Sequence, residues 1–296
     1  MRGGDAVIHA LEKEGVEYIS GFAGGGEVPL WPALRASQQI KVFSARHERQ
    51  GVEIADGYAR ATGKVGVALT GTGPGATNSL TGIAGAYADN VPVLLLMGQH
   101  PLGSMGREIQ QEVPSSIFDS LVKWKGTFAR IEDIPGTIRR AFTTLRSGCP
   151  GPVVLEMPLD VLSAEASDEV LNYEPVGPGR KAAADPGDIE RAADILVNAS
   201  FPIMNMGGGV LSAEAWDEAR ELAELLSMPW PPHWWEKGLS LKTTRCLWEA
   251  ACIPGASTLL ARPSISTARR MRCWRWATRS EYPTLPTGAL FLPMSS

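Results

Sequence analysis

The chain has 296 residues, of which 44% are hydrophobic and 20% charged, values typical of a globular protein with room for two domains. The net charge is −4 and no run of 18 apolar residues occurs, so we expect no nucleic-acid partner and no membrane span. The four cysteines form no CxxC pair, which argues against a disulfide framework or zinc site. The N-terminal segment lacks the apolar core of a signal peptide, so we expect a cytoplasmic protein.

Residues 1–162 alternate between helix and strand patterns. In chain order we predict a first helix ending at Gly15, strands over 16–20, 41–45, 65–71, 91–98 and 152–160, and helices over 48–62, from the segment 71–78 to about 88, and over 134–147. The run 91–98 is apolar throughout, as expected for a central parallel strand covered on both faces. This βαβ rhythm predicts an α/β fold with a doubly wound parallel sheet, as a first domain over 1–165.

A second α/β unit is predicted to follow a linker. Residues 166–187 are rich in proline, glycine and charge, as linkers are. A helix over 188–198, a strand over 201–207 and a helix over 212–227 then read as the start of a Rossmann-like domain over 188–230. There is room for only about one and a half βα units, so we expect this domain to be incomplete.

The composition changes near Trp230. Six of the nine tryptophans lie from there on, and residues 231–296 carry nine Lys or Arg against three Glu. The run RRMRCWRW fits neither a helical nor a strand period. One interpretation is a basic binding tail. We prefer out-of-frame translation of a GC-rich gene, which yields Arg, Trp, Pro, Ser and Cys, and we expect 231–296 to be an aberrant, poorly ordered tail.

Removal of residues 231–296 is expected to leave the thermal stability of the first domain nearly unchanged, because a segment without apolar periodicity offers no face for packing. The measurement is the calorimetric melting temperature of the full and shortened chains. A fall of several degrees would mean a loss of about 1 kcal/mol or more for a domain of this size. That result would identify the tail as a structural element.

Four segments each follow a predicted strand: the glycine-rich residues 21–26, Glu48, the segment 71–78 and Gln99. Because parallel strands end at the same edge, all four should meet at the carboxyl edge of the sheet. Open α/β sheets bind ligands at this edge. The convergence predicts a binding site there.

The segment GTGPGATN (71–78) has three interpretations. Gly71, Gly73 and Ala76 fit a dinucleotide fingerprint loosely, but the next strand ends in neutral Gln99 where an acidic residue should hold the ribose. Pro74 also removes one backbone donor from such a loop. The segment can instead be an ordinary tight turn before a helix, or a loop shaped for the close approach of a flat ligand. We favour the last.

Glu48 has a structural interpretation, since glutamates are favoured in the first turn of helices. The residues around Glu48 indicate a functional role instead. The stretch resembles the pyrimidine-binding domain of thiamine-diphosphate enzymes of the acetolactate synthase type, and the resemblance covers about residues 1–230. The matching segments are GFAGGGEVP (21–29), RHE (46–48), ADGYARATG (55–63), GPGATN (73–78), GQ (98–99), KW (123–124) and PGPVVLEMPLDV (150–161).

The resemblance implies a cofactor and a role for Glu48. In that family the glutamate bonds N1′ of the aminopyrimidine and favours the imino tautomer, which removes the C2 proton to give the ylide that attacks a 2-keto acid. It also implies the cofactor-binding residues Gly24, Gly25, Glu48, Gly73, Pro74, Thr77, Asn78 and Gln99. Gln99 has the alternative interpretation of an ordinary polar strand end.

Several positions depart from the family pattern. The family's Tyr-Pro-Gly is Phe22-Ala23-Gly24 in this chain. Asp119-Ser120 stands where acetolactate synthases commonly have Arg-Pro, and this second departure argues against FAD contacts nearby. Gln110 and His100 replace the usual Phe and aliphatic residue, so the substrate channel is expected to differ. These family enzymes hold Mg²⁺ and the diphosphate through a Gly-Asp-Gly motif, which does not occur in the sequence. We therefore predict no metal ligands in this chain.

Three hypotheses follow. The chain is a synthase or lyase subunit completed by a homodimer partner or a complementing subunit that carries the diphosphate-binding domain. Alternatively it is an inactive remnant, truncated or frameshifted, or a FAD- or nucleotide-binding module. Acetolactate synthase of branched-chain amino acid biosynthesis, sulfoacetaldehyde acetyltransferase, glyoxylate carboligase and benzoylformate decarboxylase share these motifs, so the sequence leaves the donor and acceptor open. We do not expect this chain to turn over alone.

Overall fold

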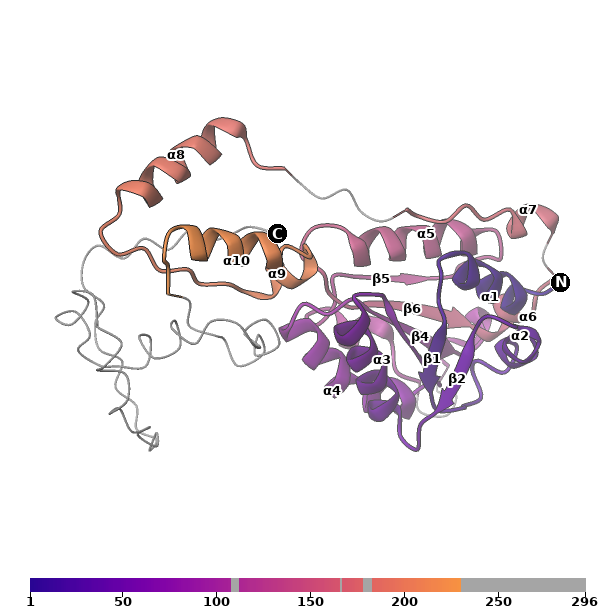
Figure 1. Ribbon diagram of the computed structural model, residues 1–296. Helices are drawn as coiled ribbons and strands as arrows, with labels where there is room; N and C mark the ends of the chain where they lie inside the picture. The colour runs from indigo at the N-terminus through magenta and orange to yellow at the C-terminus, as the bar shows by residue number, and fades with distance from the viewer. Residues whose placement is uncertain (108–111, 166, 178–182, 230–296) are drawn as a thin grey trace, which may run out of the picture. The chain divides into compact units, whose positions relative to one another are not determined.

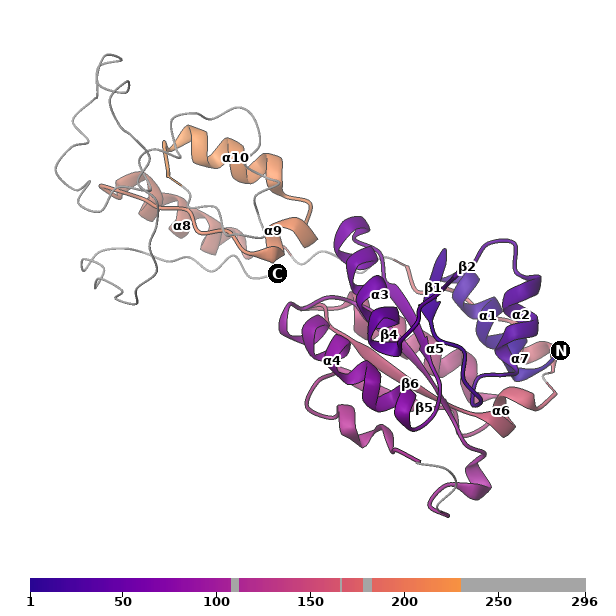
Figure 2. The ribbon, with the colours of Figure 1, turned by 90° about the horizontal axis from the view of Figure 1, so that it is seen from below.

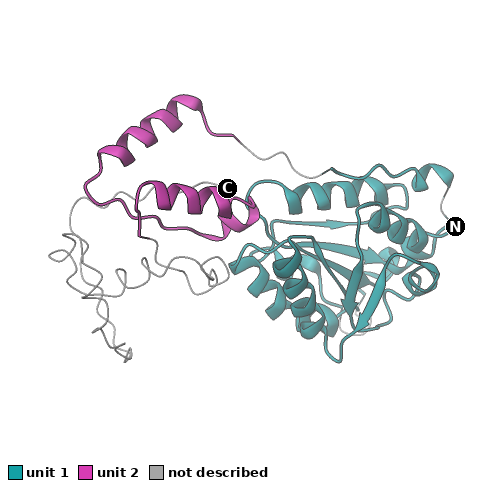
Figure 3. Ribbon diagram, in the orientation of Figure 1, with its two compact units in different colours: residues 1–180 teal, residues 181–296 magenta. Residues whose placement is uncertain are grey.

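The computed structural model describes residues 1–107, 112–165, 167–177 and 183–229 (Figure 1). The chain divides into two compact units, Met1–Arg180 and Lys181–Ser296, which are considered separately (Figure 3). The tail of 231–296, for which we expect poor order, lies outside the described residues, as does Gln110. Within the described part of the chain, no helix combines the length and apolar character that crossing a membrane requires.

The first unit is built on a six-stranded sheet in the order β2-β1-β3-β4-β6-β5, and every neighbouring pair is parallel (Figure 1). The predicted doubly wound parallel sheet is confirmed. The strands are β1 (Tyr18–Gly21), β2 (Lys41–Ser44), β3 (Gly66–Thr70), β4 (Val93–Gln99), β5 (Trp124–Thr127) and β6 (Val153–Pro158).

Helices cover both faces of this sheet (Figure 2). Leu94 and Leu96 of β4 pack on one face and Leu95 and Met97 on the other, the alternation that a strand requires. One face carries α1 (Gly3–Lys13), α2 (Leu30–Ala36), α5 (Asp133–Arg146), α6 (Leu159–Ser163) and α7 (Asp168–Leu171). The other carries α3 (Glu48–Thr62), α4 (Pro74–Ala88) and the 3-10 turn η2 (Ser115–Phe118), and a second turn, η1 (Leu102–Ser104), follows β4.

The two helices nearest the predicted site have ends that their sequences explain. The helix α3 ends at Gly63, which has the left-handed φ of 70° that favours glycine after a helix. The helix α4 starts with Pro74 in its first turn, where a missing N–H costs nothing. Gly73 precedes it with φ 56°, so this position also favours glycine.

The strand order places a topological switch point between β1 and β3. From β1 the chain runs outward to β2 on one side, while β3 lies on the other side. The connections that follow β1 and β3 therefore diverge to opposite faces and leave a crevice at their carboxyl ends. The two loops approach closely there, since a Cβ added at Gly24 would lie 2.9 Å from Cα of Gly71.

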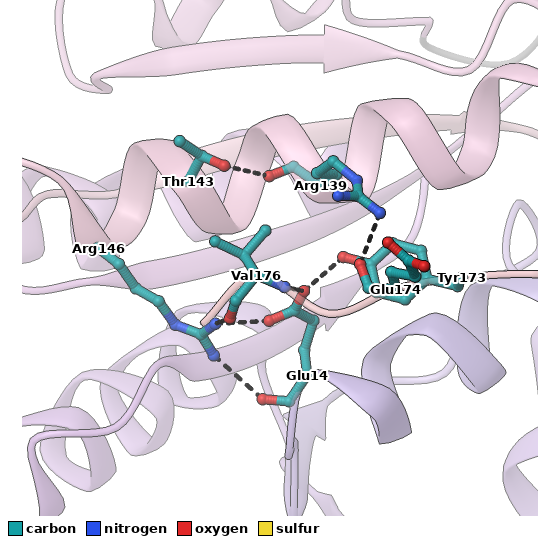
Figure 4. Close-up of polar contacts among 7 residues, drawn as sticks. All are labelled: Glu14, Arg139, Thr143, Arg146, Tyr173, Glu174 and Val176. Atoms are coloured by element: carbon teal, nitrogen blue, oxygen red, sulfur yellow. Dashed lines mark hydrogen bonds and ion pairs between the residues drawn. The ribbon is translucent and has the colours of Figure 1, made fainter. Parts of the chain in front are cut away.

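The segment after α6 is also part of the first unit. Val170 and Tyr173 are buried in its core. Glu14, at the end of α1, accepts hydrogen bonds from Arg146 Nη1 (2.5 Å), from the Tyr173 hydroxyl and from the Val176 backbone N–H (2.7 Å), as Figure 4 shows. Burial raises the pKa of the Tyr173 hydroxyl, and its bond to Glu14 raises it further. This network attaches the segment to α1 and α5.

The second unit contains α8 (Pro186–Asn198), α9 (Gly208–Ser212) and α10 (Trp216–Leu225) around a small apolar core. The strand predicted over 201–207 is wrong, because these residues have no regular secondary structure. Among the residues that the structure describes, the backbone of this segment bonds another segment from Met204 N to Pro229 O (3.1 Å). One such bond is too few for the repeated pairing that defines a strand.

Candidate functional site

The residues predicted for the site come from four elements of the first unit. Gly24 and Gly25 lie in the loop after β1, and Glu48 is the first residue of α3. Gly73 precedes α4, which carries Pro74, Thr77 and Asn78, and Gln99 ends β4. Because the strands are parallel, all these elements meet at the carboxyl edge of the sheet.

Glu48 and Asn78 form the polar centre of this edge. The Asn78 side-chain nitrogen donates a hydrogen bond to Glu48 Oε2 at 3.0 Å, which joins the first turns of α3 and α4. The Glu48 side chain is half-buried, and a Cβ added at Gly75 would lie 3.6 Å from its other carboxyl oxygen. Glycine at 75 therefore leaves room beside the carboxyl group. The Thr77 hydroxyl donates to Pro74 O of its own helix (3.1 Å).

Gln99 is buried and its amide is fully engaged within the protein. Its Nε2 donates to Glu156 Oε1 (3.0 Å) and Val113 O (3.2 Å), while its Oε1 accepts from the His100 backbone N–H (2.9 Å). The interpretation as a polar strand end explains these bonds. A contact of Gln99 with a ligand stays a prediction.

Glu27 is a member of the site that sequence reasoning missed. It lies in the loop after β1, is fully buried, and accepts a hydrogen bond from the Gly24 backbone N–H. Burial raises the pKa of its carboxyl group, and the nearby charge of Glu48 adds to this, while backbone N–H groups oppose it. The available signal was its position as the lone acidic residue among the glycines of 21–29.

Three buried side-chain atoms in the described part of the chain have no hydrogen-bond partner: Glu27 Oε2, Thr70 Oγ1 and His100 Nε2. All belong to residues at or just after the carboxyl ends of β1, β3 and β4. Buried polar atoms are normally paired, so unpaired ones clustered at one edge suggest bonds to a missing ligand. The glycines at this edge allow close approach, and the site therefore fits a flat, polar ligand.

No group of three or more His, Cys, Asp or Glu residues suited to a metal ion occurs among the residues that the structure describes.

Comparisons with known proteins identify a family for the N-terminal part of the chain. Residues 1–119 match the family model of the thiamine pyrophosphate enzyme N-terminal TPP binding domain. Curated relatives are named as acetolactate synthase large subunits. The chain is 38% identical over 239 residues to a probable one from Methanocaldococcus jannaschii and 36% identical over 238 residues to one from Haemophilus influenzae. Each match covers 77% of this chain, but only 39% and 41% of the relative's length.

A solved structure shares the fold. It is the thiamine diphosphate-dependent 4-hydroxybenzoylformate decarboxylase of Rhodococcus jostii RHA1, with a TM-score of 0.71 and 24% sequence identity. The match covers 78% of this chain and 44% of the decarboxylase chain. The motif order and the family match together identify the N-terminal part of the chain, residues 1–119, as a thiamine pyrophosphate enzyme N-terminal TPP binding domain, and acetolactate synthase large subunits are among its sequence relatives.

Proposed function

We propose that the first unit binds the aminopyrimidine half of thiamine diphosphate and that Glu48 is the residue that activates it. The observation that carries this proposal is the position of Glu48 beside the switch-point crevice, with one carboxyl oxygen held by Asn78 and the other beside Gly75. A carboxyl group fixed in this way can share a proton with a ring nitrogen of a bound ligand.

Each residue of the site has a proposed role. Glu48 holds the proton, and Asn78 fixes the orientation of its carboxyl group. Gly24, Gly25 and Gly73, with Pro74, Thr77 and Gln99, are proposed to form the surrounding walls. When bound, thiamine diphosphate supplies the electron sink for the decarboxylation of 2-keto acids.

The activity that we propose is that of an acetolactate-synthase-like carboligase or decarboxylase, a cytoplasmic transferase or lyase acting on 2-keto acids. The names of the curated relatives support it. A related acetyltransferase or lyase is the second candidate, supported by the fold shared with a decarboxylase. A module for FAD or another nucleotide is the candidate from a different class.

We propose that Mg²⁺ and the diphosphate are held by a partner, either a second copy or a complementing subunit with a diphosphate-binding domain. The support is a pair of apolar side chains that line one pocket, Phe43 of β2 and Ile54 of α3, which are 51% and 44% exposed, an unusual position for large apolar side chains. Contact with a partner would remove them from water.

Calorimetric titration of the chain with thiamine diphosphate and Mg²⁺ tests the proposal. Glu48→Ala is expected to weaken binding about 10- to 100-fold, because hydrogen bonds to charged groups contribute about 1.5–3 kcal/mol. Glu53→Ala is the matched control, since Glu53 is exposed on the same helix and pairs with Arg49 (2.6 Å). Equal affinities of the two variants, or tighter binding of FAD than of thiamine diphosphate, would contradict the proposal.

A further inference from the structure

Glu27 has a buried carboxyl group, and one of its two oxygens has no hydrogen-bond partner among the described residues. Its side chain is 0% exposed, Oε1 accepts from the Gly24 N–H, and Oε2 has no partner. The role proposed for Glu48 does not use it. A buried carboxylate with one unpaired oxygen is disfavoured, so this group needs either a neutral state or a further partner.

Glycines from three elements surround this carboxyl group. A Cβ added at Gly98 of β4 would lie 3.0 Å from Glu27 Oε2, and one added at Gly71 after β3 would lie 3.6 Å from it. A Cβ at Gly24 would lie 3.3 Å from both carboxyl oxygens. Glycine has no side-chain donor, so beyond the backbone N–H of Gly24, which bonds Oε1, these walls supply no side chain to pair a negative charge on Oε2. They let the surrounding backbone pack closely against the carboxyl group.

The charges around Glu27 favour its protonated form. Burial raises the pKa of Glu27, and Glu48 of α3 adds to the rise because two negative charges repel. The other titratable groups at this edge are His100, after β4, and Glu156 of β6, which is hydrogen-bonded to Gln99. No described cation pairs with Glu27.

We propose that Glu27 is a neutral carboxylic acid that binds thiamine diphosphate, with its Oε2 hydroxyl donating a hydrogen bond to a nitrogen acceptor of the aminopyrimidine ring. This inference rests on the proposed function and adds a residue to it. The two neighbouring carboxyl groups then have different roles towards the aminopyrimidine ring. Glu48 shares a proton with a ring nitrogen, whereas Glu27 keeps its proton and donates a hydrogen bond. The proposal requires the loop of Gly24, Gly25 and Gly26 to shift so that the ligand reaches the buried oxygen, and three successive glycines give this loop the conformational freedom to do so.

The protonation state can be measured on the full chain without any ligand. Because burial raises the pKa of Glu27, the infrared difference spectrum between wild type and Glu27→Gln is expected to keep the carbonyl band of a protonated carboxyl group at pH values above the usual Glu value of about 4.3. Absence of the band would overturn the inference. This result does not depend on the proposed function, because no cofactor is present.

The contact with the ligand is tested by calorimetric titration with thiamine diphosphate. Glu27→Gln keeps an uncharged donor and is expected to bind like wild type at about pH 6. Glu27→Leu removes the donor and is expected to bind about three- to tenfold more weakly, the effect of one hydrogen bond. Wild-type affinity should also fall relative to Glu27→Gln as the pH rises towards about 9.

The outcomes separate the two proposals. If Glu27→Leu binds as tightly as wild type, or the pH profiles of wild type and Glu27→Gln are parallel, Glu27 does not touch the cofactor and the inference is wrong. If Glu27→Leu does not fold, as judged by circular dichroism, the pH profiles decide. If wild type shows no saturable binding, the proposed function fails and the ligand role of Glu27 fails with it, whereas a missing infrared band overturns the inference about Glu27 alone.

Discussion

Glu48→Gln is expected to slow the activation of bound thiamine diphosphate by about 10²–10⁴, the usual effect of removing a positioned acid–base group, and we expect the upper end of this range. Glutamine has the same size and can still accept the hydrogen bond from Asn78, which now reaches Glu48 Oε2 at 3.0 Å. It cannot supply a carboxyl proton, so binding should suffer less than activation. The measurement is hydrogen–deuterium exchange at C2 of the bound cofactor, with a diphosphate-binding partner subunit supplied.

Glu53→Gln is the control for this experiment. Glu53 lies five residues along α3, about 140° around a helix with 3.6 residues per turn, and its exposed carboxylate pairs with Arg49. It should exchange at the wild-type rate. Equal exchange rates for wild type and Glu48→Gln would remove Glu48 from the mechanism, and fold alone is too weak a basis for naming an activity.

Local patterns explain why much of the fold could be predicted. The helix α3 runs from Glu48 to Thr62 and ends at Gly63, as predicted, because the signals for both ends lie within its own sequence. The strand β4 was predictable from an apolar run that both faces of the sheet bury. The failed strand over 201–207 shows the limit of such patterns, since a strand exists only where a partner pairs with it.

The site was predictable only in part, for a related reason. The position of Glu48 at the carboxyl edge follows from the parallel sheet, and its bond to Asn78 follows from two helices that start side by side. Glu27 could not be found in this way, because its burial results from the contact of loops far apart in sequence, with Gly71 and Gly98 as neighbours. The segment after α6 is similar, since its bonds to Glu14 join residues about 160 positions apart.

Arg146→Met is expected to have the largest effect on stability, a loss of about 3 kcal/mol in the free energy of unfolding. The Glu14 side chain is 0% exposed, and Arg146 is its cationic partner at 2.5 Å. Removing one partner of a buried ion pair leaves an uncompensated charge and costs about 3–5 kcal/mol. Since the Arg146 side chain is 24% exposed, water can replace part of the bond, and the lower end applies.

Urea unfolding of the full chain measures this effect, with two further variants. Arg139→Met is the matched control on the same helix, because its guanidinium donates to the Glu174 carbonyl (2.8 Å) and lies 5.8 Å from the centre of the Tyr173 ring but does not bond Glu14. Each of these contacts should contribute about 1 kcal/mol or less. The double variant Glu14→Gln with Arg146→Met should recover part of the loss, because no buried charge remains. Equal losses for Arg146→Met and Arg139→Met would show that the charge of Glu14 does not depend on Arg146. The Tyr173 hydroxyl and the Val176 N–H would then be sufficient to hold it, and the packing of Val170 and Tyr173 would be what fixes this segment to the first unit.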